Sequence, residues 1–203
     1  MTRQTTGPIR HTNFTPTFRR ASALVADVKR GDLDLHPPYQ RGSVWDDTQR
    51  LNLIESWLSG VPTGPIVLVD RANGEWRTQD GKRPLHDEIE VAMWGCADGQ
   101  QRITTAMAWF DDEFAVPSSW FDADLVDTTE RTPDGPYVRF TGLTRPGQLK
   151  FDMNQASFQV SEDRTCTGLA DEARTYLLIN TSGTAQTAAD LDNARCIANG
   201  DSS

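Results

Sequence analysis

The chain has 203 residues and a formal net charge of −9, with 20 Lys and Arg against 29 Asp and Glu. Affinity for duplex DNA depends on Lys and Arg that neutralise phosphates, so this balance excludes tight non-specific DNA binding by the isolated chain. The hydrophobic content of 37 % supports one core, and no stretch approaches the roughly 18 apolar residues of a membrane helix. We therefore expect one ordinary domain with no membrane partner.

The cysteines and the N-terminus predict a cytoplasmic protein. Cys96, Cys166 and Cys196 are widely spaced and form no disulfide or zinc pattern, so we expect reduced thiols. The first 20 residues are polar and lack the apolar stretch of a secretion signal. A local basic group around Arg19, Arg20, Lys29 and Arg30 leaves room for contact with one strand end or one flipped base.

The first segments of the chain contain signals for helix caps and turns. Residues 1–21 are rich in Thr, Pro and Arg and are predicted to form an N-terminal arm, followed by a single domain over residues 22–200. Ser22 is expected to cap a short helix that Gly31 ends. The alternation over residues 33–35 predicts a short strand.

The next helix has the clearest boundaries. Asp46 and Gln49 have the spacing of a capping box, and Gly60 with Pro62 stops the apolar periodicity that follows. The apolar run over residues 66–69 predicts a buried strand.

Two further turns and a strand lead to the central helix. Asn73-Gly74 predicts a hairpin turn, and the alternation over residues 89–93 predicts a strand. After the Asp98-Gly99 turn, Ile103 to Phe110 follow the best helical periodicity in the chain.

The remainder is less regular. Residues 113–172 hold several Pro and Gly turns and are predicted to form an insertion of strands and long loops. Residues 175–180 are expected to form a last strand, and Thr187 with Asp190 to cap a last helix that ends near Gly200. This order predicts an α+β (mixed α/β) fold.

The turn at Asp98-Gly99 is the first candidate site. The first N–H groups of a helix have no intrahelical partner, and the helix dipole favours an anion there. Gly99 lets the backbone approach a ligand closely, Arg102 can fork onto phosphate oxygens, and Asp98 can hold a metal ion that accompanies a nucleotide. The structural alternative is an N-capped core helix whose Gln and Arg side chains are solvated.

Two other segments are candidates for ligand contact. Tyr39, Gln40, Arg41 and Trp45 lie in one loop, where Arg41 can meet an anion and the aromatic rings can stack on a base. The alternative is that the rings fill the core and Arg41 pairs with an acid. Asn180 lies in a turn-like Asn-Thr-Ser-Gly string, for which an ordinary turn is the competing interpretation.

Taken together, these three segments resemble the N-terminal domain of GmrSD-type restriction enzymes, in the ParB/sulfiredoxin-like superfamily. The resemblance rests on three strings, namely Pro38-Tyr39-Gln40-Arg41 with Val44-Trp45, Asp98-Gly99-Gln100-Gln101-Arg102-Ile103-Thr104-Thr105, and Ile179-Asn180-Thr181-Ser182-Gly183. It covers about residues 22–110 and 175–197 and implies a ParB/sulfiredoxin-like domain with a strand-and-loop insertion, in a single-domain form.

The resemblance implies a nucleotide site, because a G-x-x-R element at a helix start binds nucleotide phosphates in this superfamily. Catalysis is assigned to Asp98 and Arg102, and Mg²⁺ to Asp98. Nucleotide binding is assigned to Gly99, Gln100, Gln101, Arg102, Thr105 and Arg41, and substrate binding to Tyr39, Gln40 and Asn180. Sulfiredoxins place a reactive cysteine directly after the glycine, where this chain has Gln100, so sulfiredoxin chemistry is not expected.

Three functions remain open at this point. The leading hypothesis is nucleoside-triphosphate-dependent phosphoryl transfer, either hydrolysis or a kinase reaction on modified or single-stranded DNA, in a phage or restriction context. The second is a nucleotide or modified-DNA sensor without chemistry, and the third is an inhibitor of a host restriction complex, each with a nuclease or other protein partner. A stand-alone nuclease is not expected, because His11, His36 and His86 form no nuclease or metal motif.

Overall fold

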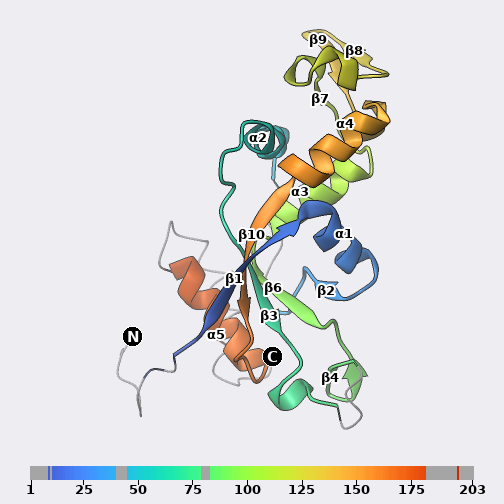
Figure 1. Ribbon diagram of the computed structural model, residues 1–203. Coiled ribbons are helices and arrows are strands. Elements are labelled where there is room, and N and C mark those ends of the chain that lie inside the picture. Colours follow the sequence, from blue (N-terminus) through green and yellow to red (C-terminus); the bar gives the residue numbers. More distant parts are fainter. Residues whose placement is uncertain (1–8, 10, 40–44, 79–82, 182–195, 197–203) are drawn as a thin grey trace.

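The computed structural model describes residues 9, 11–39, 45–78, 83–181 and 196. Its centre is a mixed sheet with the strand order β1-β10-β3-β6-β2 (Figure 1). The strands are β1 (Phe14–Arg20), β2 (Leu33–Asp34), β3 (Ile66–Asp70), β6 (Trp94–Asp98) and β10 (Ser157–Asp163). The pairs β10-β3 and β2-β6 are parallel, whereas β1-β10 and β3-β6 are antiparallel.

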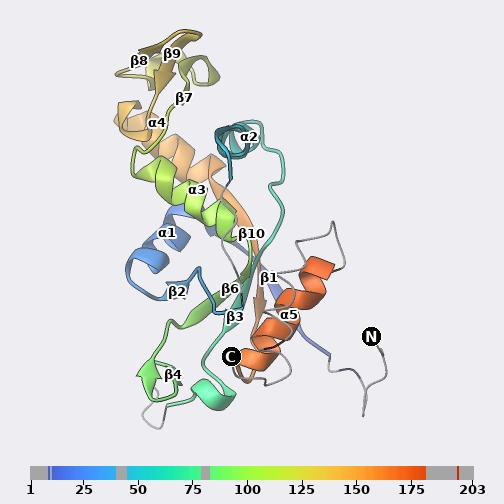
Figure 2. The same cartoon turned by 180° about the vertical axis from the view of Figure 1, so that it is seen from behind.

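Helices cover both faces of this sheet, which confirms the α+β fold. The helices α1 (Ala21–Lys29) and α3 (Gln100–Phe110) contact each other on one face, and α5 (Leu169–Thr181) lies on the other (Figures 1 and 2). Along β3, Ile66 and Leu68 join the core under α1 and α3, whereas Val67 and Val69 join the core under α5. Because side chains alternate between faces, a strand covered on both sides needs an unbroken apolar run.

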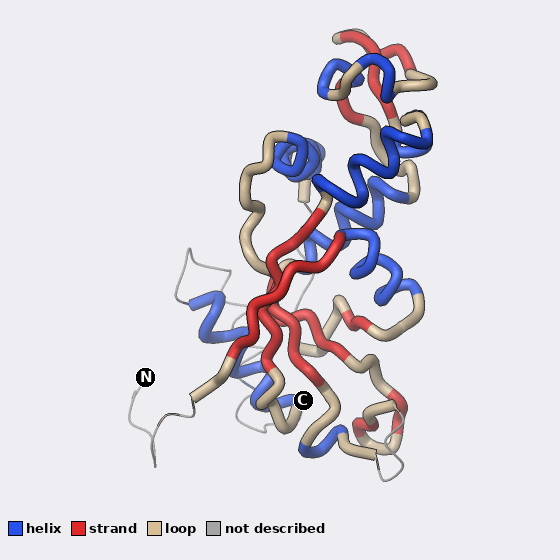
Figure 3. Tube along the Cα trace, viewed as in Figure 1, coloured by secondary structure: helices blue, strands red, loops and turns tan. Residues whose placement is uncertain are grey.

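A second group of elements projects beyond one end of the sheet (Figure 3). It holds a small three-stranded sheet and several short helices, in chain order β7 (Val116–Pro117), η2 (Ser118–Trp120), η3 (Ala123–Leu125), β8 (Glu130–Thr132), β9 (Gly135–Val138), η4 (Phe140–Gly142), α4 (Arg145–Lys150) and η5 (Phe151–Gln155). We call residues 114–155 the tip. The tip lies inside the predicted insertion, and β10, which follows it, is a strand of the central sheet.

The tip is joined to α3 by aromatic rings. Phe151 is fully buried, and its ring centroid lies 5.8 Å from that of Trp109 in α3 and 5.9 Å from that of Trp57. Trp57 belongs to α2 (Asp47–Leu58), which packs beside the same cluster. The core therefore continues from the sheet into the tip.

The predicted helix starts are confirmed in one case and corrected in another. Asp46 caps α2 and forms both capping-box bonds with Gln49, as predicted. The helix α1 begins at Ala21 with Arg20 at the cap position, so the prediction of Ser22 as cap is wrong by two residues. Gly31, with φ of +74°, follows the end of α1 as expected.

The predicted last strand over residues 175–180 is wrong, because these residues belong to α5. Its sequence Tyr-Leu-Leu-Ile is apolar enough for either a strand or a helix, and tertiary packing decides. The buried positions Glu172, Ala173 and Tyr176 have helical spacing and face the sheet. The predicted helix from Thr187 to Gly200 lies largely outside the described residues.

Two predictions around the turns are also corrected. Gly74 opens a short 3-10 helix, η1 (Gly74–Trp76), rather than a hairpin. The predicted strand over residues 89–93 is reduced to β5 (Ile89–Glu90), which pairs with β4 (Leu85–His86) in a small hairpin. The strand that leads into the candidate site is β6, whose small residues Gly-Cys-Ala gave no apolar alternation. Within the described part of the chain, no helix has the length and apolarity to cross a membrane.

Candidate functional site

The turn between β6 and α3 has the geometry of an anion-binding helix start. Gly99 is the N-cap of α3 with φ of +96°, and it offers no side chain to the first-turn N–H groups. A Cβ at this position would lie 2.2 Å from Ile66 Cδ1, so any other residue would force the Ile66 side chain to move and would also adopt an unfavourable positive φ. Among the described residues, no side chain caps the start of α3, so the N–H groups of Gln100, Gln101 and Arg102 can meet a ligand or water, and the helix dipole favours an anion there.

Arg102 fixes the shape of this turn. Its Nη2 donates to Asp98 Oδ2 at 2.9 Å and to the Pro65 carbonyl at 2.8 Å, and its Nη1 donates to the Thr63 carbonyl at 3.3 Å. The Nε–H group is buried and has no partner among the described residues. Arg102 thus ties the end of β6 to the loop before β3 and keeps a donor that no described residue uses.

The glutamines of the turn connect α3 to the second candidate segment. Gln100 is buried, with its Nε2 2.7 Å from His36 Nδ1, and Gln101 Oε1 accepts a hydrogen bond from the Trp45 N–H at 3.1 Å. The structure therefore brings residues on both sides of the 40–44 segment to the start of α3. Gln40 and Arg41 themselves lie outside the described residues.

Three other predicted residues lie away from the turn surface. Tyr39 is fully buried, and its hydroxyl donates to Glu172 Oε1 at 2.7 Å. Thr105 is buried within α3. Asn180 lies in α5, across the sheet from α3, and its side-chain amide donates to the Tyr176 carbonyl at 2.8 Å. Of the predicted set, the structure brings together Asp98 and residues 99–102.

A buried charged network joins β2, the residue after β3 and α5, and the sequence did not reveal it. Arg71 Nε and Nη2 donate to the two oxygens of Glu172 at 3.0 and 2.8 Å, and Arg71 Nη1 donates to Asp34 Oδ2 at 3.1 Å. Burial lowers the pKa of Arg71, but the hydrogen bonds and charge of Glu172, with the charge of Asp34, outweigh it and leave the pKa raised. Burial, together with Glu172, also raises the pKa of Tyr39. We call Asp34, Tyr39, Arg71 and Glu172 the Glu172 network.

No local signal could have found this network. Arg71 directly follows a buried strand and Glu172 lies in an ordinary helical sequence, 101 residues apart. Gly95 in β6 makes room for the pair, since a Cβ there would lie 2.0 Å from Glu172 Oε1. The only hint is an arginine at the end of an apolar run, which is common in solvated loops.

The donor set at the turn fits a metal ion bound to a nucleotide better than a resident metal. Among the described residues, no group of three or more His, Cys, Asp or Glu side chains is placed to hold a metal ion. Mg²⁺ commonly binds through one or two carboxylates plus substrate phosphates, and Asp98, one-third exposed, is such a carboxylate. Asp98 thus suits Mg²⁺ that arrives with phosphates.

The thiol nearest to the turn is not suited to nucleophilic chemistry. Cys96 is fully buried, and burial, with the nearby charge of Asp98, raises its pKa well above the usual range. A thiolate is the reactive form, so such a thiol is inert at neutral pH.

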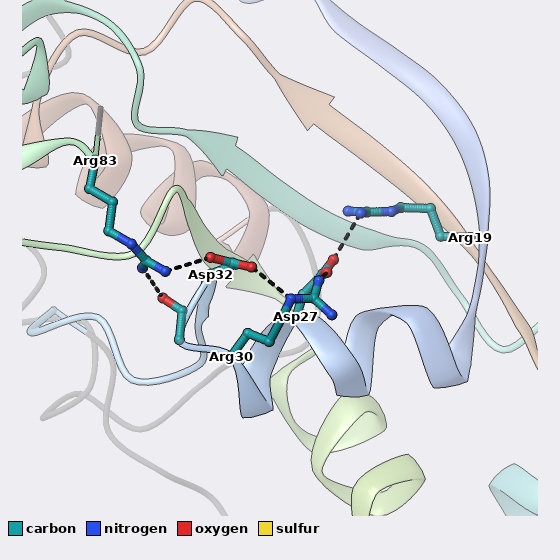
Figure 4. A network of polar contacts seen from close by, with 6 residues as sticks. Arg19, Asp27, Arg30, Asp32 and Arg83 are labelled. Carbon is teal, nitrogen blue, oxygen red and sulfur yellow. Dashed lines mark hydrogen bonds and ion pairs between the residues drawn. The ribbon is translucent and has the colours of Figure 1, made fainter. Parts of the chain in front are cut away.

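The basic group expected near α1 is paired with acids. Arg19 donates to Asp27 at 2.8 Å, Arg30 contacts Asp27 and Asp32, and Arg83 donates to Asp32 at 2.9 Å (Figure 4). These pairs tie β1, α1 and residue 83 together. Their charges are largely neutralised, which leaves little attraction for DNA phosphates.

The fold and the turn define an α+β domain whose helix α3 starts at a glycine N-cap. The chain matches the model of the family described as GmrSD restriction endonuclease, N-terminal domain, over residues 22–197. Because the match spans most of its length, the chain belongs to this family, and this supports a restriction context. Among curated proteins, none matches the chain.

Proposed function

We propose that this chain binds a nucleoside triphosphate with Mg²⁺ at the start of α3 and transfers the terminal phosphate to water or to an acceptor hydroxyl. The observation that carries the proposal is the start of α3. Its N-cap residue, Gly99, has no side chain to cap the first-turn amides, which lie beside Asp98 and Arg102. The family supplies the setting, a DNA restriction or modification system.

Each residue of the turn has a role in this proposal. The amides of Gln100 and Gln101 bind phosphate oxygens, and the Nε–H of Arg102 adds a charged donor. Asp98 holds Mg²⁺, which offsets the charge that develops on the phosphates. Arg41 and Gln40 remain predicted contacts to the nucleotide or the acceptor.

The overall charge favours recruitment to DNA by a protein partner over direct binding of the chain to bare duplex. The net charge is −9, and Arg19 and Arg30 are paired with acids. We therefore propose that a nuclease or another partner delivers the domain to modified or single-stranded DNA.

Phosphate release from ATP, GTP, CTP and UTP with Mg²⁺ tests the proposal. We expect one nucleotide to be turned over by the wild-type chain, and the rate to fall at least about tenfold in Asp98→Asn and in Arg102→Ala. Arg50→Ala is the matched control, because Arg50 is in α2 and its ion pair with Asp47 is long, at 4.0 Å. Arg102→Lys, which retains the charge, separates catalysis from the structural role of Arg102. The proposal is overturned if the wild-type chain shows no nucleotide binding and no turnover above the level of Arg102→Ala.

One observation favours a second function, a nucleotide sensor without chemistry. Both terminal nitrogens of Arg102 are already bonded to the protein, so Arg102 can act as a clamp that responds to a ligand rather than as a catalyst. Saturable binding without phosphate release, with any acceptor tested, would support this function.

A further inference from the structure

A pocket opens beside the loop that Arg102 holds. It lies between residues 60–64, the end of the tip and the paired strands β1 and β10, and its volume is about 340 Å³. Sites for small ligands usually start near 300 Å³, so this pocket can take a group of nucleobase or nucleoside size. We call it the Phe18 pocket.

The lining of the Phe18 pocket carries no ionisable side chain. Its polar side chains are the amides of Asn154, Gln155 and Gln159, the hydroxyls of Thr63 and Ser157, and the Trp57 indole N–H, which donates to the Ser157 carbonyl. Within the described part of the chain, the side chains of Gln155 and Gln159 make no hydrogen bond. An ion placed here would have no opposite charge, whereas an uncharged group with donors and acceptors would find both on each amide.

The walls of the pocket suit a flat ring. Phe18 is 80 % exposed and Val61 is 54 % exposed, although both are apolar. Phe18 pairs across the strands with Gln159, so a ring face and an amide lie side by side. A base stacks on an aromatic ring, and Gln or Asn amides pair with its edge.

The pocket is connected to the phosphate site through Arg102. Thr63 and Gly64 line the pocket, and the Thr63 carbonyl accepts from Arg102 Nη1 at 3.3 Å. Gly64 has φ of +82°, and a Cβ on it would lie 2.9 Å from the same nitrogen. A ligand that bears both a base and phosphates can therefore contact both sides of one short loop.

We infer that the Phe18 pocket binds an uncharged nucleobase, with Phe18 as the stacking surface and Gln159 as a partner for the base edge. The base belongs either to the nucleotide whose phosphates lie at α3 or to a DNA strand presented as acceptor. The inference deepens the proposed function, but its binding test needs no phosphate.

The test uses probes that separate the two sites. Adenosine, guanosine, cytidine and thymidine carry a base and no phosphate, and inorganic tripolyphosphate with Mg²⁺ carries phosphates and no base. Ligand-observed NMR with the full chain is expected to show one nucleoside binding. Phe18→Ala and Gln159→Ala are each expected to weaken it about tenfold. Phe14→Ala, the same change in the same strand but outside the pocket, should leave it unchanged.

Affinities for the nucleoside triphosphate and for a short single-stranded oligonucleotide then identify the source of the base. A tenfold loss for the triphosphate in Phe18→Ala assigns the pocket to the nucleotide, and a loss for the oligonucleotide alone assigns it to DNA. If neither affinity changes in Phe18→Ala and Gln159→Ala, and no nucleoside responds to these variants, the inference is overturned. If tripolyphosphate does not bind but a nucleoside does, the result counts against the phosphate site and not against the Phe18 pocket.

Discussion

At the scale of single residues, Gly99 combines two constraints, a positive φ and a close neighbour, of which Gly31 meets only the first. Its φ of +96° disfavours any side chain, and Ile66 occupies the space that a Cβ would need. Gly31 has a similar φ of +74°, but nothing lies within 4 Å of its virtual Cβ. A comparison of substitutions at Gly99 and at Gly31 therefore separates the cost of backbone strain from the cost of close packing.

We predict that Gly31→Ala costs about 1–2 kcal/mol of unfolding free energy, since it carries only the left-handed strain. Gly99→Ala should cost more and should also abolish nucleotide binding, because the buried Ile66 side chain must move and the added methyl group disturbs the start of α3. Urea denaturation and calorimetric titration measure the two effects. Equal costs for the two variants, with binding intact, would mean that the turn is not as tightly packed as the structure indicates.

Glu172 is the residue on which the buried charges depend. It is fully buried and pairs with Arg71 and the Tyr39 hydroxyl, so its removal leaves the buried charge of Arg71 without this carboxylate. We predict a loss of about 3–5 kcal/mol for Glu172→Ala and a smaller loss for Glu172→Gln. Arg174→Ala, which removes an exposed ion pair of the same helix, should cost under about 1 kcal/mol. A cost for Glu172→Ala as small as that control would contradict the account of the network.

At the scale of elements, α2 shows what local sequence can determine. Its capping box and its stop at Gly60 lie within a few residues of the helix ends, and both agree with the structure. We predict that Asp46→Ala destabilises the chain by about 1 kcal/mol in urea denaturation. Asp47→Ala is the neighbouring control, because the Asp47 side chain is 95 % exposed and makes no cap. A null effect of Asp46→Ala would show that the tip and sheet contacts alone hold α2.

The strand β6 and the helix α5 show where local sequence is insufficient. In β6 the small residues Gly95 and Ala97 face α5, so the usual apolar alternation is missing. In α5 an apolar run fits either type of element, and the position of Glu172 opposite Arg71 settles the choice only in three dimensions. The first candidate site was predictable because a turn, a glycine and a helix start are contiguous in the chain. The Glu172 network and the Phe18 pocket join segments about 100 or more residues apart, which no local pattern records.

At the scale of the whole molecule, Phe151 joins the tip to the sheet core. Its ring contacts those of Trp57, Trp109 and Phe140, with centroids 5.8 to 6.3 Å apart. We predict that Phe151→Ala costs about 3–5 kcal/mol and that the chain still unfolds in one transition. Met153→Ala, an exposed change in the same short helix, should stay within about 0.5 kcal/mol. Two separated transitions in the wild-type chain would contradict a continuous core.

The central claim, that the start of α3 binds a nucleoside triphosphate, is tested most directly by a thermal-unfolding screen. ATP, GTP, CTP and UTP are compared with and without Mg²⁺, at concentrations well above the dissociation constant. A ligand that binds only the folded chain should stabilise it by roughly 2–4 kcal/mol. We predict such a shift for one nucleotide, enhanced by Mg²⁺ and lost in Gly99→Ala but not in Gly31→Ala. No shift with any nucleotide, or the same shift in Gly99→Ala, would contradict the account.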